Sequence, residues 1–162
     1  MYKYFNMVKP SLIRVDADEL TYNFHIVLRY EVEKKLIGGE LPVSEVPAYW
    51  NEKMEEFVGV RPKDNAEGVL QDIHWSGGGI GYFPTYSLGN VIAGMILDRI
   101  QKEINLKNAV KRAELISIKT WLREHIHKMG GTYSPKELQR KLFGETYNPQ
   151  HLVTYLEQKY LE

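Results

Sequence analysis

Residues 68–86 hold the densest group of side chains in this sequence that could do chemistry. Gln71, Asp72 and His74 are followed, after a run of glycines, by Tyr82 and Tyr86. A histidine can donate or accept a proton near neutral pH, and hydroxyl donors can stabilise a developing oxyanion. Functional side chains often lie on loops that a rigid scaffold carries. The segment is therefore either a binding site or a polar seam of the core whose donors are simply satisfied.

Arg14 is a second candidate for binding chemistry. Its guanidinium group is a planar fork that can hold a carboxylate or a phosphate through two hydrogen bonds, a contact roughly twice as strong as a neutral one. The alternative is a residue at a helix entry that pairs with Asp16 or Asp18. The residues of segment 68–86 have comparable alternatives. His74 would pack under Trp75, and Tyr82 and Tyr86 would be core residues with solvated hydroxyls.

The sequence lacks the patterns that would supply a catalyst. Its histidines do not form the His-Glu-x-x-His zinc motif, and His125 and His127 point to different sides of a helix because they are two positions apart. The glycines at positions 77–79 lack the Lys-Ser/Thr of a phosphate-binding loop. No cysteine and no motif that presents a serine nucleophile is present. These residues offer binding groups without a catalyst, and they predict no metal ligand on this chain.

The composition excludes several classes of partner. The length of 162 residues fits a single domain that spans residues 1–162, and 43% of the residues are hydrophobic, which is enough for a core. Lys plus Arg and Asp plus Glu both total 21, so no net charge attracts nucleic acid or an anionic membrane. The absence of cysteine favours a reducing compartment, and neither a signal peptide nor an apolar stretch of about 20 residues is present. We expect a soluble, cytoplasmic protein.

The spacing of apolar residues predicts an all-α fold, an irregular bundle of about six helices. Leu20, Phe24, Val27 and Leu28 have the spacing of a buried helical stripe, and His25 beside it is expected to be a packed histidine. Gly89 and Gly94 would mark close contact between helices. Helical patterns cover residues 19–36, 48–58, 66–73, 84–104, 109–128, 135–143 and 149–160.

Several residues predict helix ends. Asp16 or Asp18 can cap the first long helix, while Ser44 and Asn65 are expected to cap the next two. Ser134, with a proline after it and a glutamate three positions on, has the pattern of a capping box.

Two motifs in this chain resemble the Taq-type zinc metallocarboxypeptidases, family M32. Residues 13–18 read Ile-Arg-Val-Asp-Ala-Asp and match that family's Ile-Arg-x-x-Ala-Asp signature. Residues 68–75 match its Gly-x-x-Gln-Asp-x-His-Trp signature at every specified position. The resemblance extends from about Asn6 to the C-terminus. It implies an all-helical, cleft-shaped and usually homodimeric enzyme that removes single C-terminal amino acids from peptides with one divalent metal, Zn or Co.

The same resemblance predicts that this chain is a part of such an enzyme. The family's His-Glu-x-x-His motif and its third metal ligand precede the Ile-Arg-x-x-Ala-Asp signature, and none of them is present here. The chain resembles the closing third of the family, whether a cloned domain, a truncated reading frame or half of a split gene. We therefore expect it to be inactive alone. Its partners would be the missing N-terminal part or a second copy.

The resemblance also implies roles for individual residues. Arg14 would hold the terminal carboxylate of a peptide, and His74, together with Tyr82 or Tyr86, would bind the substrate or stabilise the tetrahedral intermediate. Gln71 and Asp72 would orient His74. The other supporting residues would be Asp16 and Asp18. A different class of function, a free-standing helical module that binds peptides without hydrolysing them, is the alternative.

Overall fold

The computed structural model describes residue 4 and residues 6–161, and this described part contains seven α-helices, three short 3₁₀ helices and no strand. The expected all-α fold is confirmed. The chain divides into two compact units, the first ending at Ser87 and the second beginning at Leu88. Within the described residues, no helix combines the length and the apolarity that crossing a membrane requires.

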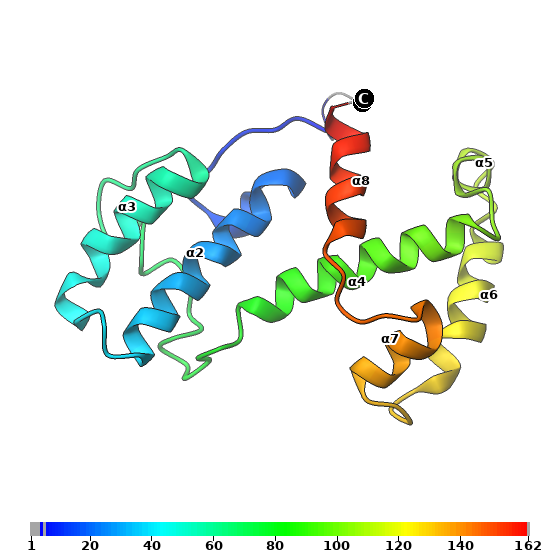
Figure 1. Cartoon of the computed structure of the whole chain (residues 1–162). Coiled ribbons are helices and arrows are strands. Elements are labelled where there is room, and N and C mark those ends of the chain that lie inside the picture. Colours follow the sequence, from blue (N-terminus) through cyan, green and yellow to red (C-terminus); the bar gives the residue numbers. More distant parts are fainter. Residues whose placement is uncertain (1–3, 5, 162) are drawn as a thin grey trace. The chain divides into compact units, whose positions relative to one another are not determined.

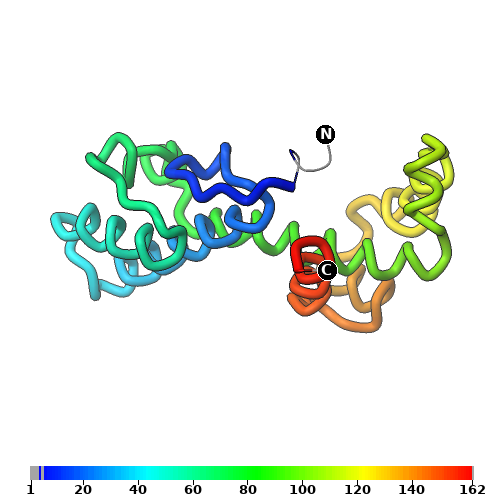
Figure 2. Tube along the Cα trace, turned by 90° about the horizontal axis from the view of Figure 1, so that it is seen from above, coloured from blue at the N-terminus to red at the C-terminus, as the bar shows by residue number. Residues whose placement is uncertain are grey.

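The first unit is built on two helices that lie side by side, α2 (Glu19–Ile37) and α3 (Val46–Val58) (Figures 1 and 2). A 3₁₀ turn, η1 (Arg14–Asp16), precedes α2. Asp18 caps α2 by accepting hydrogen bonds from two backbone N–H groups of its first turn. The cap is therefore Asp18, and not Asp16.

The core of this unit lies between α2 and α3, where aliphatic side chains surround a buried indole. Trp50 is 1% exposed, and the T-shaped contact between its ring and that of Trp75 joins the core to the segment after α3. The other buried members of the core are Leu28, Val32, Leu41, Val46, Met54 and Val58.

The prediction that Phe24 and Val27 are buried is wrong. Their side chains are 45% and 41% exposed, whereas the opposite side of α2 is buried and carries polar residues. The prediction for His25 is confirmed, since its side chain is 0% exposed. A periodic pattern identifies a face of a helix, but the tertiary contacts decide which face is covered.

Two expected features between α2 and the glycine run are also wrong. A 3₁₀ turn, η2 (Val43–Glu45), leads directly into α3, so Ser44 lies inside that turn and does not cap the helix. Residues 66–73 form turns and no helix. Asp64, and not Asn65, accepts the backbone N–H of Glu67, and the Gln71 side chain bonds to the Glu67 carbonyl, which competes with helical bonding.

The second unit contains most of α4 (Pro84–Gln101), which begins in the first unit, and four further helices (Figure 1). The helix expected over residues 109–128 is two helices, because Ala113 has a φ of 57° and an α-helix cannot continue through that conformation. Those two helices are α5 (Leu106–Lys111) and α6 (Leu115–His125). They are followed by η3 (His127–Met129), α7 (Pro135–Phe143) and α8 (Gln150–Tyr160).

Two predictions in the second unit are confirmed and one is wrong. Ser134 and Glu137 form the capping box that begins α7. Gly94 lies where α8 crosses α4, and a Cβ atom there would stand 2.9 Å from the backbone nitrogen of Leu152. Gly89 has open space around it, so it does not mark a helix contact.

Candidate functional site

The two signature segments meet at Asp72. Arg14 donates hydrogen bonds to Asp72 Oδ1 from Nε (3.2 Å) and Nη2 (2.7 Å). Arg29, on α2, donates from Nε to Asp72 Oδ2 (2.6 Å), and its Nη2 lies 2.5 Å from the same oxygen as an ion pair. The three side chains are 8%, 12% and 0% exposed in the order Arg14, Asp72, Arg29. Arg14 therefore pairs with Asp72, and not with Asp16 or Asp18.

This ion cluster has one positive charge more than it has negative charges. Burial works against ionisation of Asp72, but the hydrogen bond from Arg14 and the charge of Arg29 hold its pKa below the ordinary range. Burial lowers the pKa of Arg29, and Asp72 only partly opposes that effect. For Arg14, burial is outweighed by the hydrogen bonds that it donates to Asp72 and Tyr22, which raise its pKa. One carboxylate thus faces two guanidinium groups.

The remaining hydrogen-bonding capacity of Arg14 suits a second anion. A guanidinium group has five N–H donors. Asp72 accepts two of those of Arg14, and the Tyr22 hydroxyl accepts a third from Nη1 (3.1 Å). Two N–H groups are left over within the described structure. That number matches the two bonds through which arginine holds a carboxylate.

His74 lies beside this cluster in a pocket of aromatic rings. Its Nε2 is 3.2 Å from the Tyr86 hydroxyl, and its Nδ1 is 3.6 Å from Asp72 Oδ1, beyond hydrogen-bond range. The His74 ring lies 4.5 Å from that of Phe83 and stacks on Tyr82 at 5.7 Å. His74 is therefore positioned mainly by aromatic contacts, and it does not pack under Trp75.

The two candidate tyrosines differ in their contacts. Tyr86 is half-buried, shares a hydrogen bond with His74, and its ring centre lies 5.1 Å from the Arg14 guanidinium carbon. Tyr82 is 51% exposed and touches His74 only through its ring. Since Tyr86 contacts both candidate binding groups, its hydroxyl is the better placed of the two to act together with them.

Glu33 holds the two ends of the glycine run together. Its Oε1 accepts the indole N–H of Trp75 (2.6 Å), and its Oε2 accepts the backbone N–H of Gly81 (3.1 Å). Gly81 has a φ of 75°, a conformation that a residue with a Cβ rarely adopts. Because Trp75 follows His74 and Gly81 precedes Tyr82, this carboxylate on α2 anchors the backbone next to both His74 and Tyr82.

Three predicted supporting residues lie away from His74. Asp16 is exposed in η1, and Asp18 is occupied as the cap of α2, where hydrogen bonds from Thr21 and Lys9 overcome its burial and lower its pKa. Gln71 donates its hydrogen bond to the Glu67 carbonyl and not to His74. Asp72 is hydrogen-bonded to Arg14 and Arg29, and its Oδ1 lies 3.6 Å from Nδ1 of His74.

Sequence reasoning missed four residues of the site, namely Tyr22, Arg29, Glu33 and Phe83. One signal was available for two of them. His25, Arg29 and Glu33 recur every fourth residue, which places them on one face of α2. A row of ionisable residues at that spacing could have indicated a polar face that other charges cover.

Comparisons with known proteins identify the family. The family model described as Carboxypeptidase Taq (M32) metallopeptidase matches residues 1–160. The chain belongs to the M32 carboxypeptidase family. It is 44% identical over 162 residues to thermostable carboxypeptidase 1 of Pyrococcus furiosus, and the alignment covers 99% of this chain and 32% of that protein. It is 42% identical over 156 residues to carboxypeptidase 1 of Bacillus subtilis, covering 96% of this chain and 31% of that one.

Solved M32 structures agree with this assignment. Trypanosoma cruzi metallocarboxypeptidase 1 superposes with a TM-score of 0.95 at 40% identity, over 99% of this chain and 34% of that protein. A Pyrococcus furiosus carboxypeptidase gives 0.94 at 44% identity. The chain therefore has the fold of one part of an M32 enzyme, and it spans about a third of the length of these relatives.

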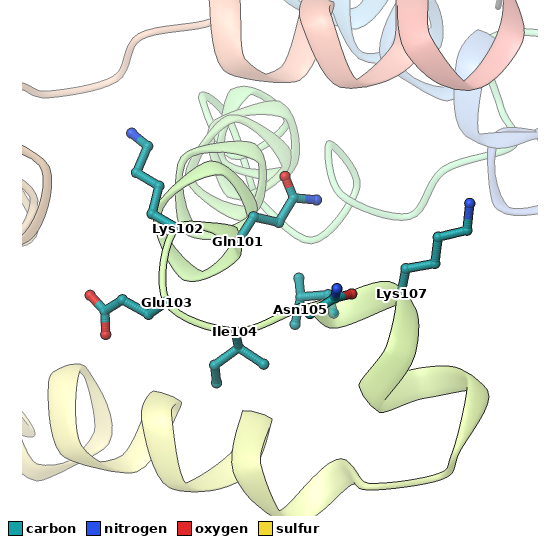
Figure 3. Close-up of a pocket in the computed structure, with 7 residues that line it drawn as sticks. Gln101, Lys102, Glu103, Ile104, Asn105 and Lys107 are labelled. Carbon is teal, nitrogen blue, oxygen red and sulfur yellow. The ribbon is translucent and has the colours of Figure 1, made fainter.

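The part of this M32 chain that the structure describes offers no metal site of its own. Among the described residues, no group of three or more His, Cys, Asp or Glu side chains lies close enough together to hold one. A surface pocket of about 380 Å³ in the second unit also lacks the signature residues (Figure 3). It is lined by the turn after α4, and its acidic residue, Glu103, is already bound to Arg99 and Trp121.

Proposed function

We propose that this chain supplies the substrate-binding wall of an M32 carboxypeptidase, with Arg14 as the group that holds the free C-terminal carboxylate of a peptide. The observation that carries the proposal is the ion cluster, in which two guanidinium groups face one carboxylate and two N–H donors of Arg14 remain. A substrate carboxylate would supply the missing negative charge and accept both donors.

The charge of the cluster favours this role on energetic grounds. A buried charge without a counter-ion costs several kcal/mol, so the unbalanced guanidinium charge favours an incoming anion. Asp72 meanwhile holds the Nε edge of Arg14, which keeps the side chain in one orientation before the substrate arrives. An amidated C-terminus and an internal peptide bond carry no negative charge, so neither can neutralise the cluster. This difference would restrict the enzyme to free C-termini.

His74 and Tyr86 would act next to the carboxylate. They share a hydrogen bond, and Arg14 lies against the Tyr86 ring, so both polar tips belong to the same site. A neutral imidazole or a phenol can donate to the oxygen of a peptide carbonyl as negative charge develops on it. Tyr82 would cover the His74 ring on its exposed side. In this proposal His74 contacts the reacting group and Tyr86 supports it.

The remainder of the enzyme would come from outside this chain. Its relatives are about three times as long, and the His-Glu-x-x-His motif is absent from this sequence. We propose that the complete enzyme uses a divalent metal, Zn or Co, and works in the cytoplasm, to which the lack of cysteine points. It would be completed by the N-terminal part or by a second copy, as in a homodimer. The chain alone would bind a peptide end without cutting it.

An N-acetylated dipeptide with a free carboxylate, compared with its C-terminal amide, tests this function on the chain as it stands. Calorimetry should detect binding of the carboxylate and not of the amide, and no amino acid should be released after Zn²⁺ or Co²⁺ is added. Arg14→Ala should weaken carboxylate binding about tenfold or more, because charged hydrogen bonds are worth roughly 1.5–3 kcal/mol.

Two results would contradict the proposal in different ways. Equal binding of the carboxylate and the amide, or no effect of Arg14→Ala, would exclude the carboxylate site. Turnover that a chelator abolishes would show that the chain is a catalyst by itself. Asp16→Asn is the matched control, because Asp16 lies in the same 3₁₀ turn as Arg14, is exposed, and makes no contact with the cluster.

A further inference from the structure

Tyr22 lies in the first full turn of α2 and meets the ion cluster from the side opposite Asp72's bonds. Its hydroxyl oxygen accepts the N–H of Arg14 Nη1 at 3.1 Å, and the guanidinium carbon lies 6.0 Å from its ring centre. The side chain is half-buried and therefore still reachable from solvent. Neither family signature includes this position, and nothing in the apolar pattern of α2 distinguishes it.

The hydrogen-bond direction at Tyr22 determines what its hydroxyl can do next. Arginine has donors only, so the Tyr22 oxygen must be the acceptor in this contact. The phenolic hydrogen is then free to point elsewhere, and it has no acceptor among the described residues. A hydroxyl polarised by a neighbouring guanidinium is also a stronger donor than an isolated one.

The free donors of Arg14 and Tyr22 together form an anion site with three hydrogen-bond donors. One free N–H of Arg14 is on Nη1, which lies 3.1 Å from the Tyr22 oxygen, and the other is on Nη2, while Asp72 fixes the guanidinium plane through the Nε edge. A carboxylate has two oxygens with about four acceptor positions, enough to accept all three hydrogens. A neutral carboxamide has one such oxygen, and its N–H₂ group would face the donors.

We infer that Tyr22 is a substrate-binding residue that donates a third hydrogen bond to the carboxylate held by Arg14. The inference rests on the proposed function, since it deepens the same carboxylate site. Together with Arg14, Tyr22 distinguishes a free C-terminus from an amidated one, because Arg14 has donors only and the Tyr22 oxygen already accepts from Arg14, so its hydrogen is what it offers the ligand.

Tyr22→Phe tests the inference, because it removes the hydroxyl and keeps the ring. Calorimetric titration with the N-acetylated dipeptide should show affinity about tenfold lower, as for a hydrogen bond to a charged group. Tyr30→Phe is the matched control, since Tyr30 lies on the same helix, is 44% exposed and has its ring against Lys34, and no hydrogen bond joins it to the cluster; the affinity of this variant should be unchanged.

An NMR readout separates donation from mere positioning of Arg14. The Nε–H signal of Arg14 reports its bond to Asp72, and it should be unchanged in unliganded Tyr22→Phe. A loss of affinity with an altered Arg14 signal would overturn the inference, because Tyr22 would then act only by orienting the guanidinium. Unchanged affinity would overturn it as well. If Arg14→Ala also leaves carboxylate binding unchanged, the proposed function fails; if only Tyr22→Phe has no effect, the proposed function stands and this inference alone fails.

Discussion

Helix α2 departs from the usual arrangement of a surface helix on both of its long faces. The face covered by the rest of the first unit carries His25, Arg29 and Glu33 among its aliphatic residues. The opposite face exposes Phe24 and Val27. Polar residues are ordinarily solvated and apolar residues ordinarily buried. Arg29 and Glu33 on the buried face are therefore held by specific pairing, although the ring nitrogens of His25 have no hydrogen-bond partner among the described residues. The exposed face lacks the cover that its composition calls for.

The buried face shows how charges can be packed inside a small unit. Arg29 has Asp72 as its partner, and its Nη1 also donates to the backbone oxygen of His25 (2.8 Å). The Arg29 guanidinium carbon lies 4.8 Å from the Trp50 ring centre, so apolar groups cover the charge while polar groups bind it. Glu33 is occupied by Trp75 and Gly81. Burial of such groups is tolerated only when each is paired.

The exposed face suits a surface that further protein covers. Contiguous exposed apolar side chains usually mark an interaction site. Relatives about three times as long have the additional chain that could cover such a face. A difference in pairing between the two faces thus predicts opposite responses to substitution, and three experiments use that contrast.

Removing the counter-ion of the buried face should have the largest effect. Asp72→Asn leaves two guanidinium groups without an ionised partner, and we expect a loss of about 3–5 kcal/mol in the free energy of unfolding. Urea denaturation would measure it. The double variant with Arg29→Met should lose less than Asp72→Asn alone, since one of the two unpaired charges is then gone. A double variant as unstable as the single one would show that charge is not the cause.

Acidification should weaken the buried face next, through His25. Burial, followed by the charges of Arg29 and Arg14, lowers the pKa of His25 from 6.5 to about 4, against the opposing effect of Asp72 and Asp18. Between these values the unfolded chain binds a proton that the folded chain does not, so stability falls as the pH drops through that window. We expect a loss of about 2 kcal/mol between pH 7 and pH 5.

His25→Gln supplies the control for this pH dependence. The variant has no titratable group at position 25, so its unfolding free energy should change less between pH 7 and pH 5 than that of the unaltered chain. Asp72 and Asp18 have pKa values below the ordinary 3.8, so their contributions are lost only at still lower pH. Equal pH slopes in the two proteins would mean that His25 does not titrate in this way.

The exposed face should respond least. Phe24→Ser and Val27→Ser should each change the unfolding free energy by no more than about 0.5 kcal/mol, as expected for surface positions. Both should reduce self-association of the isolated chain in sedimentation experiments. Leu28→Ala, one position from Val27 but 0% exposed, should instead cost about 2–5 kcal/mol. Large losses at positions 24 and 27 would show that this face is covered in solution.

The local signals in the sequence predicted helices well where caps and breakers agreed. The Ser134 capping box was readable and the cap of α2 was narrowed to Asp16 or Asp18, because each depends on hydrogen bonds within a few residues. The predictions failed where a local preference was weak or met a competing bond. Residues 66–73 formed turns, and the positive φ of Ala113 divided a helix whose apolar spacing was continuous.

The residues of the candidate site could likewise be predicted only in part. Arg14, Asp72, His74 and Tyr86 could be named from residue types and signature motifs, which specify chemistry without geometry. Their partners could not. Arg14 and Asp72 are 58 positions apart, and Trp75 and Glu33 are 42 apart, so nothing local relates them.

By itself, then, the sequence determined an all-α chain of the M32 family and the residue types at its site. Only the tertiary structure decided which face of α2 is buried, that Asp72 joins Arg14 to Arg29, and that Tyr22 lies at the free corner of Arg14. The physical reason is that helices form through bonds between residues three or four positions apart. The choice of a buried face depends on charges and rings supplied by distant segments, and on α2 those partners outweighed the apolar pattern.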